Sequence, residues 1–374
     1  MAAPTFGTAA QFSSSTARYW VTALSATTFV IAYQASGGLT AVVASISGTT
    51  ITYGTSVILT ANSSANESIG VVALSSTSFV AFYRNSSSGT YSCIASTTDG
   101  NITISSTGTT VDLPPAGSVG STVNGWCVLS STHFVVGSRA SDSNSYVYVG
   151  SVSGNTITLG TRVAFGAGAN PINRRISLVG ISSTHFATIY NKASTTSTAF
   201  VCSVSGTTIT KGTDYDYTTT DGSGDQAVFA VDSTHFGIVW NRSAGGTNGA
   251  TSAICTFSGT TISAIGTKVE QSSPNTGNLV GACKIDDTHF VTTWRDNTAT
   301  GRVVIGTISG AAITYDTAAN FVASSIDNGN LGTSVALLGT TKFVTIWAVS
   351  DVGQARIGEF SIAGAVNSGF FNFM

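Results

Sequence analysis

Residues 181–211 read ISSTHFATIYNKASTTSTAFVCSVSGTTITK, and the pattern of this stretch recurs along the whole chain. A polar turn leads into a phenylalanine and an alternating apolar segment, a second such segment follows, and an SGTT turn leads into a third. Short alternating segments between Gly, Ser, Thr and Asn turns are typical of β-strands. The phenylalanine recurs seven times at intervals of 50 to 55 residues, as Phe29, Phe79, Phe134, Phe186, Phe236, Phe290 and Phe343.

Each repeat holds four β-patterned segments, because a run of small apolar residues also precedes every phenylalanine, as in IGVVAL at residues 69–74. Four short strands per unit, with no helical period anywhere, is the content of one propeller blade. The sequence therefore predicts an all-β fold, a single seven-bladed β-propeller with four antiparallel strands per blade over residues 1–374. We expect the blades to begin near residues 18, 68, 124, 176, 226, 279 and 333.

The two ends of the chain indicate how the ring closes. Residues 4–12, PTFGTAAQF, match the fourth segment of a blade, such as ITYGTSVIL at residues 51–59, yet they precede any first segment. The last repeat has an irregular fourth segment, residues 363–374. We predict that the N-terminal strand completes the blade anchored at Phe343, with the C-terminal tail as the competing candidate.

Composition excludes several classes of partner. Fifteen Lys and Arg against seventeen Asp and Glu give a net charge of -2, with no basic run to neutralise a phosphate backbone, so we predict no nucleic-acid binding. Hydrophobic residues make up 42% of the chain, but no stretch is long enough to cross a bilayer, so we predict no membrane insertion. The first residues also lack the pattern of a Sec signal peptide.

The repeat motifs SSTHF (182–186) and SVSGTTIT (203–210) resemble those of propeller proteins of bacteria and phages, including seven-bladed lectins and virion surface proteins. The resemblance covers essentially the whole chain and implies the propeller fold. It implies little about function, because one superfold hosts unrelated activities. The WD dipeptide, the kelch double glycine and the sialidase box S-x-D-x-G-x-T-W are absent, so no active-site residue can be carried over.

The chemistry-bearing residues are spread over the repeats. All four histidines directly precede an anchor phenylalanine, and the five cysteines occupy recurring positions in different blades. Equivalent positions on a ring of blades point away from one another, so they cannot converge on a metal or form a dyad. The carboxylates also look scattered among loops. We therefore predict free, buried thiols, no metal site, no cofactor and no enzymatic activity.

An aromatic residue stands four positions after the anchor in six of the seven repeats, and a basic residue follows in most of them. The pairs that we predict as candidate ligand-binding residues are Tyr83 with Arg84, Tyr190 with Lys192, Trp240 with Arg242, and Trp294 with Arg295. An aromatic face beside hydrogen-bond donors suits a sugar ring. The competing interpretation is that these rings are core between blades, because both faces of a propeller blade are covered.

The C-terminal tail carries Phe370, Phe371, Phe373 and Met374 within five residues. Such an end left in water would be an aggregation liability. We predict that these four residues dock into a partner subunit or a second virion protein, with burial in the seventh blade as the alternative.

Two functions fit these observations. The first is a non-enzymatic phage virion surface component, such as a head decoration, fibre or tail-associated protein, assembled with other virion proteins in the bacterial cytoplasm and able to contact host glycans. The alternative is a lectin-like carbohydrate-binding adhesin, located outside the bacterium by a non-Sec route.

Overall fold

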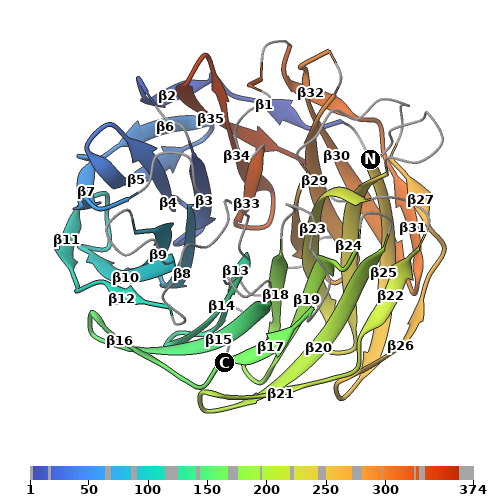
Figure 1. Cartoon of the computed structure of the whole chain (residues 1–374). Helices are drawn as coiled ribbons and strands as arrows, with labels where there is room; N and C mark the ends of the chain where they lie inside the picture. The colour runs from blue at the N-terminus through green and yellow to red at the C-terminus, as the bar shows by residue number, and fades with distance from the viewer. Residues whose placement is uncertain are drawn as a thin grey trace.

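The computed structural model of the chain describes residues 3–15, 18–63, 69–85, 91–113, 125–139, 144–166, 176–193, 196–219, 223–242, 250–271, 280–296, 298–323, 326–327 and 333–361. These residues form seven antiparallel sheets arranged around a central axis (Figure 1). Each sheet is one blade, with its four strands in the order A, B, C and D from the centre outward. The outermost strand D is interrupted in every blade and consists of two short strands that both pair with strand C. The predicted seven-bladed propeller is confirmed.

The blades are numbered here in chain order of their inner strands. Strands A are β3 (Tyr19–Ala23), β8 (Gly70–Ser75), β13 (Gly125–Ser130), β18 (Ser177–Ser182), β23 (Ser223–Asp232), β28 (Gly281–Asp286) and β33 (Ser334–Leu338). Strands B are β4 (Thr28–Ala35), β9 (Ser78–Arg84), β14 (His133–Arg139), β19 (His185–Asn191), β24 (His235–Arg242), β29 (His289–Arg295) and β34 (Lys342–Val349).

The outer half of each blade is built in the same way. Strands C are β5 (Gly38–Ser47), β10 (Tyr91–Thr98), β15 (Ser145–Ser153), β20 (Ser197–Ser205), β25 (Ala250–Ser258), β30 (Gly301–Ser309) and β35 (Val352–Glu359). Strands D are β6 (Thr50–Tyr53) with β7 (Val57–Thr60), β11 (Ile104–Thr107) with β12 (Val111–Asp112), β16 (Thr156–Leu159) with β17 (Val163–Phe165), β21 (Thr208–Lys211) with β22 (Tyr215–Thr218), β26 (Thr261–Ile265) with β27 (Val269–Glu270), β31 (Ala312–Tyr315) with β32 (Ala319–Val322), and, in the seventh blade, β1 (Thr5–Phe6) with β2 (Ala10–Ser13).

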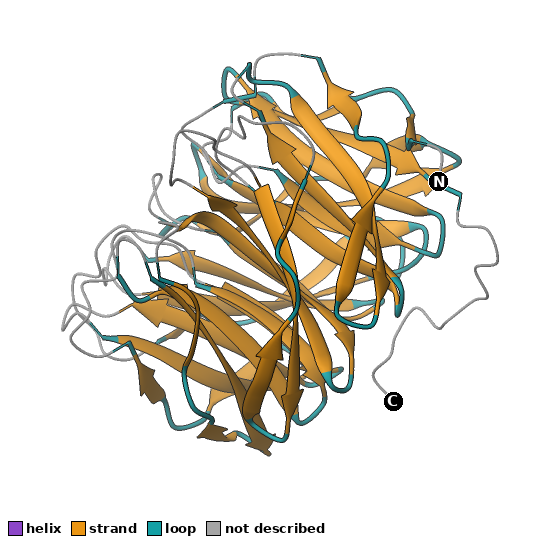
Figure 2. Ribbon diagram, turned by 90° about the vertical axis from the view of Figure 1, so that its right-hand side faces the viewer, coloured by secondary structure: helices purple, strands orange, loops and turns teal. Residues whose placement is uncertain are grey.

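The core lies between the blades. Ile189 and Val201 of the fourth blade, for example, pack with Ile238 and Cys255 of the fifth in one buried cluster. The anchor phenylalanines are fully buried, and Phe134 lies over the glycine that pairs with it on strand C, Gly150, where an added Cβ would meet the ring at 2.2 Å. The side view in Figure 2 shows strands joined by loops, and the described residues include no helix that could cross a membrane.

The N-terminal segment supplies the outer strand of the seventh blade. β1 and β2 both pair antiparallel with β35, the strand C of that blade, and Figure 1 shows the blue β1 and β2 beside the red β35. The Gly7 N–H donates to Ile357 O at 3.0 Å. Phe6 packs edge-on against the anchor Phe343, with ring centroids 6.0 Å apart. The competing C-terminal tail, residues 363–374, lies outside the described residues, as do the predicted docking residues Phe370, Phe371, Phe373 and Met374.

A glycine at the interruption of strand D lets neighbouring blades approach closely. At Gly212 in the fourth blade, an added Cβ would lie 1.9 Å from the carbonyl oxygen of Thr260 in the C–D turn of the fifth blade. At Gly54 in the first blade, it would lie 1.8 Å from Ile102 O of the second. In every blade but the sixth, strand D is therefore packed against the C–D turn of the following blade.

Candidate functional site

The predicted aromatic ligand-binding residues are part of the core. Tyr83, Tyr190, Trp240 and Trp294 are each at most 2% exposed. The rings of Tyr190 and Trp240 face the preceding blade, whose outer strand lies directly against them. The predicted stacking platform is therefore not formed by these rings, and the competing interpretation, core between blades, describes them.

Ring-to-ring contacts seal the interfaces. Tyr190 meets Phe165 of the third blade edge-on, with centroids 5.0 Å apart, and Trp240 meets Tyr217 of the fourth at 5.4 Å. Aromatic pairs in such geometry contribute about 0.5–1.5 kcal/mol beyond the area that they bury. The aromatic residue that recurs four positions after the anchor phenylalanine therefore packs between blades and does not form a ligand contact.

The predicted basic residues lie at the ends of strands B. Lys192 has a side chain that is 42% exposed, and its Nζ lies 3.2 Å from Asp216 Oδ2. Arg295 donates from Nε to Ile326 O at 2.8 Å, and Arg84 is half-buried. Arg242 ends β24, and its side chain lies outside the described part of the chain.

Residues that pair with one another across strands B, C and D place a carboxylate near the basic residues at the ends of strands B. In the fourth blade, Tyr190 pairs with Thr198, and Thr198 pairs with Asp216. The same register gives Tyr83, Ser92 and Asp112 in the second blade, and Trp240, Thr251 and Glu270 in the fifth. The aromatic and hydroxyl members are buried, whereas the strand D member is exposed. This set is called the rim row below.

The rim row of the fourth blade is the most polar. Thr198 donates from Oγ1 to Asp216 Oδ1 at 2.6 Å, on the carboxylate that also binds Lys192. The phenol of Tyr190 donates to Asp214 Oδ2 at 3.1 Å, and Lys211 Nζ lies 2.5 Å from Asp214 Oδ1. Burial, together with the nearby Asp214 charge, raises the pKa of Tyr190, so the phenol stays a donor. Two ion pairs thus flank one tyrosine hydroxyl at the outer edge of the blade.

The sequence contains a signal for these carboxylates, which is their spacing from a glycine. Asp112, Asp216 and Glu270 each stand four residues after the glycine that interrupts strand D. The other blades have Ile58, Ala164, Asn320 and Gln11 at the equivalent position. Because the residue type varies, the acids look scattered until they are aligned on the glycine.

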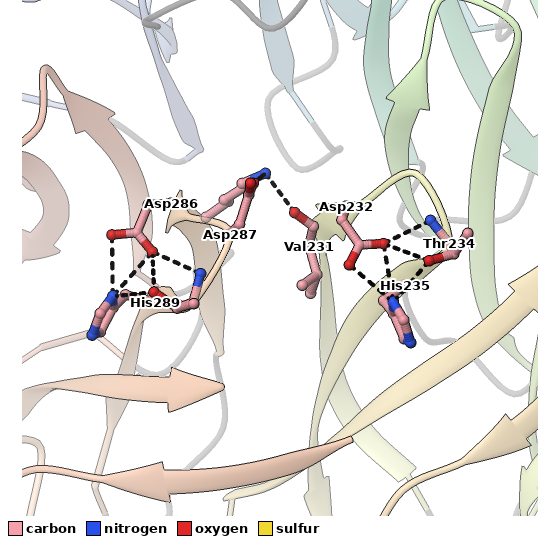
Figure 3. Close-up of polar contacts among 9 residues, drawn as sticks. Val231, Asp232, Thr234, His235, Asp286, Asp287 and His289 are labelled. Atoms are coloured by element: carbon pink, nitrogen blue, oxygen red, sulfur yellow. Dashed lines mark hydrogen bonds and ion pairs between the residues drawn. The ribbon is translucent and has the colours of Figure 1, made fainter. Parts of the chain in front are cut away.

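The histidines lie in separate A–B turns. Figure 3 shows the turns of the fifth and sixth blades, where each histidine contacts its own aspartate. In the fifth blade, His235 Nδ1 lies 2.9 Å from Asp232 Oδ2, and Asp232 Oδ1 accepts from Thr234 N at 2.7 Å. In the third blade Ser130 takes the place of the aspartate and accepts from the backbone N–H of His133 at 3.1 Å. The motif is a turn-forming element, and no group of side chains suited to a metal ion occurs among the described residues.

The cysteines are free. Four are buried, and Cys283 is partly exposed on strand A of the sixth blade. Burial raises the pKa of Cys202, Cys255 and Cys283 to about 12. These thiols therefore stay protonated at neutral pH, and they do not supply the thiolate that nucleophilic catalysis needs.

No family model matches the chain, and no curated protein matches it by sequence. Solved structures do. The BP39L lectin from Burkholderia pseudomallei aligns with a TM-score of 0.69 and 9% identity over 93% of this chain and 99% of that one. The six-bladed fucose-recognising lectin from Aleuria aurantia aligns with a TM-score of 0.50 and 14% identity over 84% and 98%. The NanB sialidase from Streptococcus pneumoniae aligns with a TM-score of 0.51 and 9% identity over 95% and 70%.

At such low identity these likenesses establish the fold alone, and the resemblance to propeller lectins is confirmed at that level. Two of the three similar proteins are lectins and one is an enzyme.

Proposed function

We propose that this chain is a non-catalytic carbohydrate-binding propeller whose sugar subsites lie at the rim rows. The observation that carries the proposal is the row of the fourth blade, where Thr198, Asp216 and Lys192 form one connected, partly exposed polar cluster. The likeness to lectin propellers over nearly the full chain supports the same class of function.

The rim row has the chemistry that sugar hydroxyls require. A hydroxyl both donates and accepts, so it is best bound between a carboxylate and a cation. Asp216 has lone pairs left after its bonds to Thr198 and Lys192, and the ammonium of Lys192 has three N–H donors. Both groups are already oriented by each other, which lowers the entropy lost on binding.

The row also predicts which blades bind. The second, fourth and fifth blades have a carboxylate at the exposed position, whereas the first and third have Ile58 and Ala164, which cannot accept a hydrogen bond. We therefore expect three equivalent sites on one ring. Several weak sites on one rigid body give avidity for a glycan-coated surface without a tight single site.

Catalysis is not part of the proposal. The sialidase similarity carries no active site, because the sialidase box is missing from the sequence.

A glycan array followed by calorimetry with the best ligand, and with α-methyl-L-fucoside, tests the proposal. Asp216→Asn and Lys192→Ala should each weaken binding at the fourth blade about tenfold or more, because hydrogen bonds to charged groups contribute roughly 1.5–3 kcal/mol. The matched control is Asp287→Asn, which removes a charge from an A–B turn. A protein that binds no glycan, or variants that bind as the parent does, would contradict the proposal.

The virion location stays a prediction. A gene neighbourhood of capsid, portal and tail genes would support it, and it is compatible with glycan binding by a particle surface.

A further inference from the structure

The inner strands of all seven blades enclose a cavity of about 740 Å³. Its lining comes from the later residues of strands A, such as Ala73, Val128 and Leu337, and reaches the A–B turns at Asp232 and Asp287. It is therefore wide at the face that carries the A–B turns. The volume lies within the range of about 300–1,000 Å³ that is usual for small-molecule sites.

Two tryptophans narrow the channel toward the other face. A second cavity of about 80 Å³ lies there, lined by earlier residues of the same strands. Trp20 and Trp126 line both cavities and meet edge-on, with ring centroids 5.1 Å apart. Trp126 lies over Gly70 of the second blade, where an added Cβ would be 2.1 Å from the indole. These rings form an apolar floor that depends on a glycine in the neighbouring blade.

The charges on the wall are confined to one sector. Most of the lining is Val, Ala, Leu and Ile, and its charged members are Asp232, Lys284 and Asp287 of the fifth and sixth blades. Lys284 is already engaged, because its Nζ donates to Asp287 Oδ1 at 2.6 Å and to the carbonyl oxygen of Val231 (Figure 3). The lining therefore carries a net charge of -1, two aspartates against one lysine.

Both carboxylates are accessible. The side chain of Asp232 is 40% exposed and that of Asp287 is 65% exposed. Burial pushes the pKa of Asp232 up, but the hydrogen bonds from Thr234 and His235 outweigh it, and the pKa lies below the ordinary value. Asp232 is thus ionised at neutral pH.

We propose that the central cavity binds an amphipathic organic cation, with its apolar body against the inner strands and the Trp20–Trp126 floor, and its cationic group between Asp232 and Asp287. The apolar wall would attract any hydrophobic ligand of this size. The single acidic sector selects the sign of the charge. This site is separate from the rim rows and does not rest on carbohydrate binding.

Three probes with the same alkyl chain test the selection: octyltrimethylammonium, octyl sulfate and 1-octanol. Calorimetry measures affinity, and tryptophan emission reports on the floor. We expect the cation to bind about tenfold more tightly than the alcohol, and the sulfate to bind most weakly, because one close charge contact near a protein surface is enough for such a ratio.

The decisive variant is Asp232→Ser with Asp287→Ser. It gives both turns serines like those of the fourth blade, ISSTHF at residues 181–186, so the turn should still form. The variant should lose the preference for the cation while binding 1-octanol as the parent does. A second variant, Ala230→Phe, places a ring in the cavity and should weaken all three probes, with its melting temperature as the check on folding.

The proposal fails if none of the probes binds, if all three bind equally, or if the double serine variant keeps the preference for the cation. Glycan binding at the rim rows should be unchanged in the double variant, so failure here leaves the carbohydrate proposal standing.

Discussion

The ring closes where β1 and β2 of the N-terminal segment pair with β35, and this closure is called the seam. The seam and the interfaces between the other blades use the same contacts. At the seam, Phe12 of the N-terminal strand meets Tyr33 of the first blade at 5.4 Å, and inside the ring Phe165 meets Tyr190 at 5.0 Å. The Gly7 N–H donates to strand C of the seventh blade at 3.0 Å, as Gly212 does to strand C of the fourth at 2.9 Å. The packing of a blade therefore depends on the strand sequence and not on whether the chain is continuous.

The seam differs from the other interfaces at two positions. Arg356 on β35 donates from Nη1 to Phe321 O at 2.6 Å and from Nε to Gly7 O at 2.5 Å. The equivalent strand C residues of the other blades are Val42, Ile94, Tyr148, Phe200, Ala253 and Val304. Asp316 of the sixth blade replaces the strand D glycine, and the seventh blade has no continuous C–D turn for it to meet, because its strand D comes from the N-terminus. Where the chain does not connect strand C to strand D, the seventh blade therefore has additional hydrogen bonds from Arg356. The preceding blade no longer needs a glycine at the interruption of its strand D.

Deleting residues 1–13 should have the largest effect on the seam. The deletion removes β1 and β2 and uncovers Phe343, Tyr33 and the edge of β35. Losing a buried phenylalanine costs about 3–5 kcal/mol, so we expect a loss of roughly 5 kcal/mol or more and a much lower melting temperature in calorimetry.

The control for the deletion is a protein that lacks only residues 1–3, which precede the paired segment. It should melt as the full chain does. Equal melting temperatures for the full chain and the 1–13 deletion would show that another segment fills the outer strand of the seventh blade.

Phe12 at the seam and Phe165 inside the ring occupy equivalent positions, so Phe12→Ala and Phe165→Ala compare the stability of the two interfaces. Both rings are buried against a tyrosine of the following blade. Each change should lower the free energy of unfolding by about 3–5 kcal/mol in denaturant titrations. A much smaller cost for Phe12 would mean that the N-terminal strand is held loosely and that the seam is the weak point of the ring.

Arg356→Met tests the hydrogen bonds that the guanidinium donates at the seam. Methionine keeps the aliphatic stem but leaves Phe321 O and Gly7 O without their donor. We expect a loss of about 1.5–3 kcal/mol in the free energy of unfolding. Lys192→Met is the control, because its exposed ion pair with Asp216 lies within the fourth blade and should contribute under about 1 kcal/mol. If the two changes lower the free energy of unfolding equally, the hydrogen bonds of Arg356 contribute no more than an exposed ion pair.

The fold could be predicted from the repeat because every local signal agrees. The anchor phenylalanine, the small-residue inner strand and the SGTT turn recur in one order, and the inner strands begin within a few residues of the expected positions, as at Tyr19 and Gly125. The match of residues 4–12 to a fourth segment also indicated the closing strand. Sequence alone left the C-terminal tail as a competitor, because alternation shows that a segment can pair and not which edge it finds.

The site could not be predicted in the same way. Alternation places Trp240 on one face of its strand, but both faces of a propeller blade are covered, so the pattern does not distinguish a ligand platform from core. The rim row was not predicted because its members in one blade lie on three different strands, and only the sheet register brings Thr198 beside Asp216. The central cavity depends on seven strands about 50 residues apart and on the size of Trp20 and Trp126, which no local pattern encodes.

The smallest effect concerns the glycine that interrupts strand D, tested by Gly212→Ala inside the ring and Gly7→Ala at the seam. At Gly212 the new methyl would lie 1.9 Å from the backbone oxygen of Thr260, so a turn must move, whereas at Gly7 the nearest atom is Thr49 Cβ at 2.5 Å. Overpacking of this kind costs about 1–3 kcal/mol. We expect the internal change to cost more, because the closest atom at Gly212 is a backbone oxygen, whereas at Gly7 it is a more distant side-chain atom.

The difference between Gly212→Ala and Gly7→Ala does not depend on how alanine affects the unfolded chain. Replacing glycine by alanine also stiffens the unfolded chain and stabilises the fold by about 0.4–1 kcal/mol, but this contribution is the same at both sites and cancels in the difference. Denaturant titrations of the two variants and of Thr213→Ala, an exposed neighbour, give the three values. If Gly7→Ala costs as much as Gly212→Ala, the first-blade turn at Thr49 is held as firmly as an internal turn.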